Sequence, residues 1–548
     1  MDTYDRIDIQ ELPLSVPLYR RQAEDFLGRN GLRLEEVDLY LAILDDDGAI
    51  LAGGGLHRDI IKCIAVSEEA RSRGLSVPLI SRLVAEAAGR GFTNLKVFTK
   101  PENRSVFESL GFRVLAEAPK AILMENGRGL EDYCQSLRNH RADGVIVMNA
   151  NPFTFGHRYL VEQASAFLSA ETGESRIVVI PVKEDASRFP YNERLEMVRQ
   201  GSKDLADVVE GSDYQISAAT FPTYFLKALS DASETQMRLD IDLFGRHIAP
   251  SLGAGFRFVG SEPSDPLTAR YNELLREMLP SYGIKVVEIP RLSDAEGPVS
   301  AARVRAALDA GRFPKALTPA STWPYLLAGL AERALRMELD APLKPGLVCP
   351  GSVGAHKDMD YDLMRKGIGA IRPFFPRMAQ AGSPDELRQQ GIDAEKAMLA
   401  ATGGVNTHRG AIFALGLALN ACGDSGRMAA LAIRICGTEN TPGARRMALS
   451  GYEMLFNDWL PFYRSVKDDE FGLQKTLLRI MSGLDDTCVI HRVGQDRAQA
   501  VKAEAGKGNV QAGQLEEMCG RYAAEGISPG GAADMLALTL FMDSIFNQ

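Results

Sequence analysis

The chain is long, acidic and of ordinary composition. Its 548 residues exceed what one hydrophobic core supports, so we expect three or four domains. Hydrophobic residues make up 45% and charged residues 24%, as in typical globular proteins. The net charge of −10 excludes a general nucleic-acid binder, and no apolar run reaches the roughly 20 residues of a membrane helix. We therefore expect neither a nucleic-acid nor a membrane partner.

The first residues and the cysteines indicate the cellular compartment. The opening MDTYDRIDIQ is acidic where a secretory signal would be basic and then apolar. The seven cysteines are scattered, odd in number and without metal-ligand spacing. A reducing cytoplasm is our prediction.

The first part of the chain, residues 1–130, mixes strand-like runs such as 39–44 with a clear helical stretch at 77–88. Arg71, Gly74 and Ser76 lie in VSEEARSRGLSVPL, where a strand-like run passes into this helix. Small residues there let backbone N–H groups approach a pyrophosphate. An ordinary strand–turn–helix explains the pattern as well.

Together with NRSVFESLGF (103–112), this segment resembles the N-acetyltransferase (GNAT) family. The resemblance implies an α+β GNAT-like domain over residues 1–130, with coenzyme A cradled at Arg71 and Gly74. Ser76 stands where the family has a final Gly or Ala, and no general base can be named.

Residues 140–315 alternate short apolar runs with amphipathic segments, which predicts an α/β, Rossmann-like domain with a parallel sheet. Its strongest signal is VIVMNANPFTFGHRYL (145–160), a buried strand, a polar turn and a helix. The turn holds Asn149 and Asn151, and Thr154, Gly156 and His157 follow. Gly156 permits close backbone approach, the helix start favours phosphate, and His157 can donate to a phosphoryl oxygen.

This motif resembles the (His/Thr)-x-Gly-His motif of the nucleotidyltransferase superfamily, which implies in-line attack on the α-phosphate of ATP. VSAARVR (299–305) resembles the superfamily's Ile-Ser-Ser-Thr-x-Val-Arg, with Ser300 and Arg305 matching and alanines at two hydroxyl positions. Between the two motifs, Gly260 and Glu262 fall where related enzymes contact nucleotide. Four cationic residues are candidates for binding phosphate, although each is equally explained as a surface charge. They are Lys183, Arg188, Arg194 and Arg305.

Over residues 1–315 the segments NPFTFGHRYLVEQA, VKEDASRFPYNERLEMVRQG and VGSEPSDPLTARYN look like the citrate lyase ligase family. The resemblance implies that acetate attacks ATP, giving acetyl-adenylate and pyrophosphate. The prosthetic-group thiol on the acyl-carrier subunit of citrate lyase then takes the acetyl group and releases AMP. The GNAT-like module would recognise the coenzyme-A-like arm of that carrier.

From residue 322 to 548 the strand pattern stops, and helical-period stretches such as 411–421 and 532–545 predict an all-α domain. Polar motifs interrupt the helices: KPGLVCPGSVGAHKDMD, TGGVNTHRGAIF, DDTCVIHRV and SPGGAADM. Together they look like the triphosphoribosyl-dephospho-CoA synthase family. That implies a reaction that joins the ribose 2′-hydroxyl of 3′-dephospho-CoA to C1′ of ATP and releases adenine.

By analogy with those motifs we nominate a second set of site residues. His356, Asp358, His408 and Asp485 would be catalytic, and Asn406, Arg409 and Arg492 would bind substrate. Asp358, Asp360 and Asp486 would hold Mg²⁺ with the triphosphate. A helix cap or a solvated charge explains any single aspartate as well. The stretch 422–451 is shorter than the family's usual loop, so a slow or altered synthase activity is one expectation.

We thus predict a bifunctional citrate lyase maturation enzyme that uses ATP, Mg²⁺, acetate and 3′-dephospho-CoA. Two alternatives stay open. One is a simple adenylyltransferase acting on a pantetheine-phosphate-like acceptor. The other is a ligase whose C-terminal part is an inactive carrier-binding scaffold.

Overall fold

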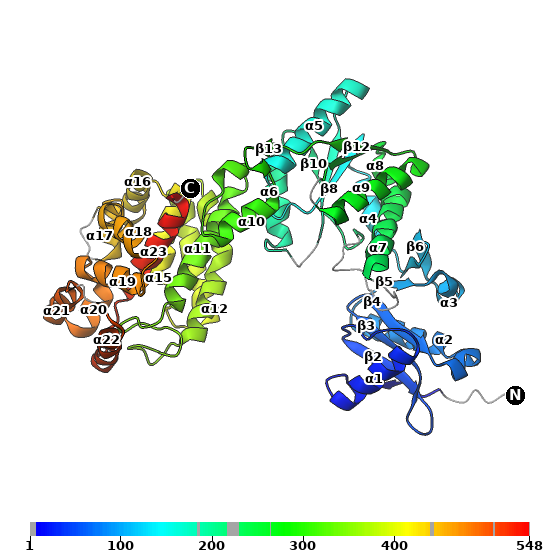
Figure 1. The fold of residues 1–548 in the computed structure, drawn as a ribbon, viewed down its shortest axis with the longest axis horizontal. Coiled ribbons are helices and arrows are strands. Elements are labelled where there is room, and N and C mark those ends of the chain that lie inside the picture. The colour runs from blue at the N-terminus through cyan, green and yellow to red at the C-terminus, as the bar shows by residue number, and fades with distance from the viewer. Residues whose placement is uncertain are drawn as a thin grey trace. The chain divides into compact units, whose positions relative to one another are not determined.

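The computed structural model describes residues 7–183, 187–215, 229–262, 265–438, 443–507 and 510–546 (Figure 1). The chain forms two compact units, Met1–Val299 and Ser300–Gln548. The first unit is mixed α/β and the second is helical, as predicted. The finer boundaries at 130, 140, 315 and 322 stay predictions.

The first unit begins with a mixed sheet of seven strands in the order β1-β2-β3-β4-β5-β7-β6. Its strands are β1 Gln10–Glu11, β2 Leu39–Leu44, β3 Ile50–His57, β4 Ile60–Val66, β5 Leu95–Thr99, β6 Arg113–Ala118 and β7 Ala121–Asn126. The helices of this region are α1 Pro17–Arg29, α2 Ser76–Gly89 and α3 Arg104–Glu108. The predicted strand at 39–44 and helix at 77–88 are thus confirmed. The assignment to the GNAT fold stays a prediction.

Only β4 and β5 run parallel in this sheet, and their pairing is short. It covers Ile60 with Lys96 and Ile61 with Val97, whereas both strands continue further. The unpaired continuation leaves backbone N–H and C=O groups of two neighbouring strands facing a gap.

The second sheet of the first unit is parallel throughout, in the order β10-β9-β8-β11-β12. Its strands are β8 Gly144–Met148, β9 Ile177–Pro181, β10 Asp207–Val208, β11 Phe256–Gly260 and β12 Lys285–Ile289. The helices around it are α4 Gly129–Leu137, α5 Phe155–Thr172, α6 Tyr191–Ser202, α7 Leu229–Leu243, α8 Ala249–Leu252 and α9 Pro266–Met278, with the π-helix η3 Phe244–Ile248. Every residue of β9 is buried, as expected for an apolar strand covered on both faces. The predicted parallel α/β arrangement is confirmed.

The two sheets share one hydrophobic core, in which Tyr40 and Leu123 belong to the same cluster as Val145 and Ile180. Polar contacts reinforce this junction. The Glu117 N–H donates to the Asp242 carboxylate at 2.8 Å, and His247 Nε2 lies 2.9 Å from the Leu115 carbonyl oxygen. Burial lowers the pKa of His247, so the neutral ring donates this bond.

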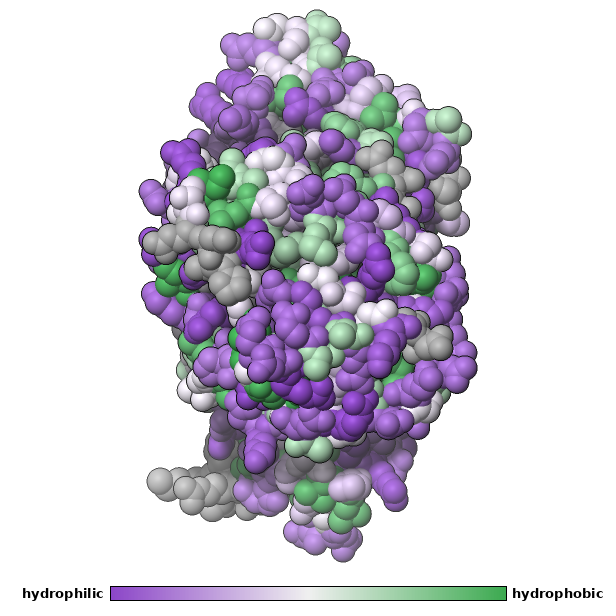
Figure 2. Space-filling model, turned by 90° about the vertical axis from the view of Figure 1, so that its left-hand side faces the viewer, coloured by the Kyte–Doolittle hydropathy of each residue, from purple (hydrophilic) through white to green (hydrophobic). Residues whose placement is uncertain are grey.

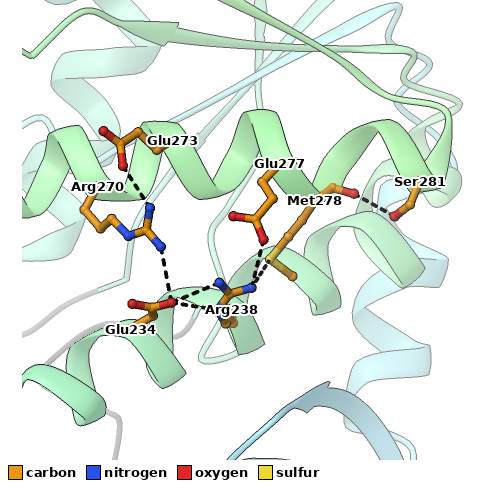
Figure 3. Close-up of polar contacts among 7 residues, drawn as sticks. All are labelled: Glu234, Arg238, Arg270, Glu273, Glu277, Met278 and Ser281. Atoms are coloured by element: carbon orange, nitrogen blue, oxygen red, sulfur yellow. Dashed lines mark hydrogen bonds and ion pairs between the residues drawn. The ribbon is translucent and has the colours of Figure 1, made fainter.

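An ion-pair cluster joins α7 to α9 (Figure 3). Glu234 accepts hydrogen bonds from Arg238 at 2.9 Å and from Arg270 at 3.3 Å. Arg270 also binds Glu273, and Arg238 binds Glu277. The hydrogen bond from Arg238 is the main reason that the pKa of Glu234 is lowered. Because the carboxylate is partly exposed, water screens the cluster and its contribution to stability is small.

The second unit contains only helices among its described residues, apart from one isolated bridge between Cys349 and Ser352. They are α10 Ala301–Asp309, α11 Trp323–Asp340, α12 Tyr361–Ile371, α13 Phe375–Gln380, α14 Pro384–Ala401, α15 Arg409–Ala421, α16 Ser425–Cys436, α17 Ala444–Leu449, α18 Leu460–Val466, α19 Gly472–Gly483, α20 Thr487–Val493, α21 Gln495–Ala505, α22 Ala512–Glu525 and α23 Gly530–Phe546. The π-helix η7, Leu455–Trp459, precedes α18. The predicted all-α region is confirmed.

The core of this unit is built on α11, α15 and α23, which pack against one another. Most side chains of α15 and α23 are buried, because their Ala- and Leu-rich sequences are apolar on every face. Figure 2 shows a face of the molecule on which hydrophilic residues dominate and apolar ones form small separate patches. Within the described residues, no helix has both the length and the apolar composition to cross a bilayer.

The buried face of α23 provides a test of this core. Phe541 is 0% exposed, whereas Phe546 on the same helix is 46% exposed. We expect Phe541→Ala to cost about 3–5 kcal/mol of unfolding free energy, because it leaves a cavity, and Phe546→Ala to cost less than half as much. Both tryptophans of the chain, Trp323 and Trp459, belong to the second unit, so urea unfolding followed by tryptophan fluorescence reports on it alone. Equal losses for the two variants would contradict this packing.

Candidate functional sites

The turn after β8 leads into α5 through a reciprocal cap. Thr154 Oγ1 accepts a hydrogen bond from the His157 N–H at 3.3 Å, and His157 Nδ1 accepts from the Thr154 N–H at 3.1 Å. Because a backbone N–H can only donate, Nδ1 is the unprotonated nitrogen and Nε2 carries the proton. Burial and the charge of Arg291 lower the pKa of His157 to about 4. The ring is thus neutral at pH 7 and keeps an N–H donor on its outer edge.

Gly156 is required by its surroundings. A Cβ added there would lie 2.4 Å from the Val299 carbonyl oxygen, closer than any side chain permits. Val299, the first residue of the second predicted motif, therefore packs directly on the first turn of α5. Ser300 caps α10, accepting from the Arg303 N–H at 3.3 Å, as predicted. Ser300 and Arg305 belong to the second unit, and their phosphate contacts stay predictions.

The ends of β11 and β12 add further polar groups at the same edge of the parallel sheet, where ligands of such folds bind. Gly260 ends β11, and Glu262 after it forms an ion pair with Arg291. The Arg291 N–H also donates to Ser261 Oγ at 3.2 Å. Arg291 is a further cation that was not predicted from the sequence, and it comes two residues after the end of β12.

The cations after β9 have different surroundings. Lys183 is exposed and lies 3.6 Å from Asp213, and Arg188 is exposed as well. Arg194 is 0% exposed and is neither a surface charge nor an accessible phosphate ligand. Asn151 holds the chain before α6, since its Oδ1 accepts from the Phe189 N–H at 3.2 Å.

The first sheet has a cavity of about 350 Å³ at the gap between β4 and β5. Arg71, Ser76, Lys100 and Asn103 contribute its polar lining, and Ile80 and Phe107 part of its apolar lining. Gly74, next to it, has a φ of 67°, which a residue with a side chain rarely adopts. Among the described residues that line the cavity there is no Asp, Glu, His or Cys.

In the second unit the structure brings His356 and Arg492 together with Ser528. Arg492 Nη2 lies 3.2 Å from His356 Nδ1, and Ser528 Oγ lies 2.8 Å from Nε2. Since arginine can only donate, Nδ1 accepts and Nε2–H donates to Ser528. Burial, then the charge of Arg492, lowers the pKa of His356. Asp358 lies 3.9 Å from Nδ1 and is largely exposed.

Two carboxyl groups meet the first turns of α15 and α23. Asp486 accepts from the N–H groups of Cys488 and Ala532, both at 2.9 Å. Asp534 lies so close to α15 that a Cβ at Gly410 would be 1.9 Å from its Oδ2. Burial is the main cause of the raised pKa of both groups, and the charge of Asp486 further raises that of Asp534. Asp534 lies within the quoted SPGGAADM motif, yet nothing in the sequence distinguished it from a helix-surface acid.

Other nominated residues have local partners. Asp360 caps α12, accepting from the Leu363 N–H at 2.8 Å, and Asn406 accepts from the Arg409 N–H at 3.1 Å. Asp485 pairs with Lys502 at 2.6 Å. These contacts are what a capping or ion-pair role requires, and a binding role for the same residues stays a prediction.

His408 is a buried neutral ring, because burial and then Lys344 lower its pKa to about 4. Lys344 itself is 2% exposed and donates to the Glu338 carbonyl oxygen at 2.6 Å and to its carboxylate at 2.5 Å. The sequence analysis missed both members of this buried pair.

No group of three or more His, Cys, Asp or Glu in the described part of the chain is arranged to hold a metal ion. Mg²⁺ needs only one or two carboxylates when phosphate oxygens and water complete its shell. Asp486 and Asp534 are two buried carboxyls, and the charge of Asp486 raises the pKa of Asp534; Asp486, like Asp360, also caps a helix. The Mg²⁺ assignment stays a prediction.

Comparison with known proteins divides the chain in two. Residues 143–326 match the family model described as citrate lyase ligase C-terminal domain. Residues 324–441 and 434–548 match the model described as ATP:dephospho-CoA triphosphoribosyl transferase.

Individual relatives show the same division. The citrate (pro-3S)-lyase ligases of Escherichia coli and Haemophilus influenzae are 40% and 39% identical to this chain. Each alignment covers 55% of this chain, and 88% and 91% of the respective relative. A probable 2-(5''-triphosphoribosyl)-3'-dephosphocoenzyme-A synthase of Stutzerimonas stutzeri is 37% identical over 40% of this chain and 91% of its own length.

The lowered pKa of His157 predicts a pH-dependent stability. Its folded pKa of about 4 lies below the ordinary value of 6.5, so the unfolded chain binds the proton more tightly. The stabilisation is complete above about pH 6.5 and is lost as the pH falls toward 4. We expect His157→Gln to reduce the loss of melting temperature between pH 7 and pH 5, measured by calorimetry. The exposed His140→Gln is the control, and an unchanged pH dependence in His157→Gln would contradict the assignment.

The raised pKa of Asp534 predicts a pH dependence of stability that is opposite to that of His157. Folding favours its protonated form, so its ionisation removes stability as the pH rises. We expect Asp534→Asn to raise the melting temperature of the second unit at pH 8 by about 2–4 °C, the shift that roughly 1 kcal/mol produces in a domain of this size. The gain should shrink at pH 5. The exposed Asp468→Asn is the control, and tryptophan fluorescence is the measurement; a lower melting temperature at pH 8 would show that the carboxylate is stabilising.

Proposed function

Because the chain belongs to the citrate lyase ligase family over its first part and to the triphosphoribosyl-dephospho-CoA synthase family over the rest, we propose that it is a bifunctional enzyme of citrate lyase maturation. The first family consists of ligases and the second of transferases. One observation carries the proposal: two separate parts of one chain each cover about nine-tenths of a different relative.

In the proposed ligase reaction, an acetate oxygen attacks the α-phosphorus of ATP. An O–P bond forms, the bond to the β-phosphate oxygen breaks, and pyrophosphate leaves. The thiolate of the carrier's prosthetic group then attacks the acetyl carbonyl carbon, and AMP leaves. Acetate needs this activation because a carboxylate oxygen is a poor leaving group.

The groups at the edge of the parallel sheet support this chemistry. The neutral His157 has an Nε2–H donor that would stabilise charge on a phosphoryl oxygen, and the first turn of α5 presents backbone N–H groups. Arg291 adds a fixed positive charge near the ring. Lys183 and Arg188 would supply further charge, and a phosphate contact of Arg305, which belongs to the second unit, stays a prediction. Mg²⁺ bound to the triphosphate would neutralise the leaving pyrophosphate.

In the proposed synthase reaction, the 2′-hydroxyl oxygen of 3′-dephospho-CoA attacks C1′ of the ATP ribose. The bond from C1′ to adenine breaks, and the triphosphate stays on the product. The hydroxyl needs a base and the leaving adenine needs a proton or a hydrogen bond. Asp486, Asp534 and His356 are the groups whose burial tunes them for proton transfer.

The cavity between β4 and β5 supports a role in holding the carrier. Its unpaired strand edges can bind an amide-containing arm, and Arg71 and Lys100 can bind the phosphates. We propose that the module binds the arm through these cations and strand edges.

Two parallel reactions test the proposal. With Mg-ATP and 3′-dephospho-CoA we expect free adenine; with Mg-ATP, acetate and deacetylated carrier we expect AMP and pyrophosphate, both separated by liquid chromatography. His157→Ala should lower AMP formation by about 100-fold and leave adenine release unchanged. Asp486→Asn should lower adenine release by about tenfold or more and leave AMP formation unchanged. Arg71→Glu should raise only the KM for the carrier.

Each half can fail separately. Intact ATP in the first reaction would contradict the synthase half and direct attention to the stretch 422–451, of which 439–442 lies outside the described residues. AMP transfer to a pantetheine phosphate without acetate would favour a simple adenylyltransferase. Unchanged carrier kinetics in Arg71→Glu would contradict the role of the cavity.

A further inference from the structure

A buried arginine organises the turn at the end of β8. Arg194 lies in the first turn of α6 and is 0% exposed. Its Nε donates to the Phe189 carbonyl oxygen at 3.1 Å, and its Nη1 donates to the Val182 carbonyl oxygen at 2.8 Å. The same Nη1 lies 2.7 Å from the Asn149 carbonyl oxygen and 2.9 Å from Asn149 Oδ1, and its two hydrogens are shared among these two oxygens and that of Val182. One guanidinium thus connects the chain after β8 with the chain after β9 and the start of α6.

This contact decides which end of the Asn149 amide faces outward. A guanidinium has donors and no acceptor, so the amide atom that faces Arg194 has to be the oxygen. The Ser187 hydroxyl lies 3.4 Å from the same oxygen. The amide nitrogen therefore points away from the guanidinium, and Asn149 is exposed. Two N–H donors are presented at the edge of the sheet, in the turn that leads to Thr154 and His157.

We propose that Arg194 is a positioning residue that holds Asn149 as a hydrogen-bond donor, and that Asn149 recognises an anionic oxygen of the substrate. The oxygen belongs to a nucleotide phosphate or to the carboxylate of the acid; this choice of ligands rests on the proposed ligase function. Arg194 does not touch the ligand, because its guanidinium is buried among acceptors of the protein. Its charge stabilises the turn, and its geometry sets the amide orientation.

Three substitutions in the full-length chain separate orientation from stability. Asn149→Asp keeps the acceptor for Arg194 and replaces the donor with a second acceptor, so the fold should stay as stable as the wild type. Asn149→Ala removes both groups and should lower the melting temperature. Arg194→Lys loses the fork geometry and should lower both stability and affinity. Arg199→Lys, on the exposed side of the same helix, is the matched control.

The measurements are Mg-ATP affinity by equilibrium dialysis, the KM for acetate in pyrophosphate release, and the melting temperature by calorimetry. If the oxygen is a phosphate, Asn149→Asp and Asn149→Ala weaken Mg-ATP binding by about tenfold or more. If it is a carboxylate, Mg-ATP binding is unchanged and the acetate KM rises by a similar factor. In the Asn149→Ala background, Arg194→Lys should change neither quantity by more than about twofold, while it still lowers the melting temperature.

Two results would overturn the inference. One is wild-type Mg-ATP affinity together with a wild-type acetate KM in Asn149→Asp. The other is an affinity loss from Arg194→Lys that is as large in the Asn149→Ala background as in the wild type, since Arg194 would then act by another route. Failure of the proposed function looks different: the wild type would bind Mg-ATP without releasing pyrophosphate on addition of acetate, and the affinity comparison would still test the orientation of Asn149.

Discussion

The N–H groups in the first turn of a helix have no partner inside the helix and must find acceptors elsewhere. In this protein many of the acceptors are the residues that the sequence nominates for function. Thr154 and His157 close the start of α5, Ser300 closes α10, and Asp486 satisfies N–H groups of both α20 and α23. The same hydrogen bonds that stabilise the helix ends thus hold these side chains in one rotamer. A site built in this way is rigid because the fold is rigid.

Burial then shifts the pKa values of these side chains, downward for the histidines and upward for the carboxyl groups. Removing water disfavours the charged form, which lowers the pKa of His157, His356 and His408 and raises that of Asp486 and Asp534. A neutral histidine donates from one ring nitrogen and accepts at the other. In His157 and His356 a neighbouring donor determines which nitrogen accepts. The protein therefore sets tautomers as well as charges.

The two proposed reactions attack ATP at different atoms, the α-phosphorus and C1′. Charge develops on phosphate oxygens in the first and on the ribose and adenine in the second, so one set of donors cannot serve both. The structure offers two different environments: a parallel sheet edge with a histidine donor and cations, and a helical unit with paired carboxyls. Apart from Ser300 and Arg305, which belong to the second unit, each unit contains the polar residues of its own family's motifs.

The sequence by itself determined the periodic elements and the local caps. The strand at 145–148, the helices at 77–88 and 411–421 and the cap at Ser300 depend on neighbours within a few residues, so apolar period and residue type suffice to predict them. Only the tertiary structure decided which distant groups meet. Arg194 reads as a surface charge on a polar helix until three carbonyl groups from other segments surround it, and Asp534 reads as a helix-surface acid until α15 packs against it. Burial comes from contacts between elements, and it determines the pKa and the tautomer of a side chain. The pattern of residues along the sequence does not contain these contacts.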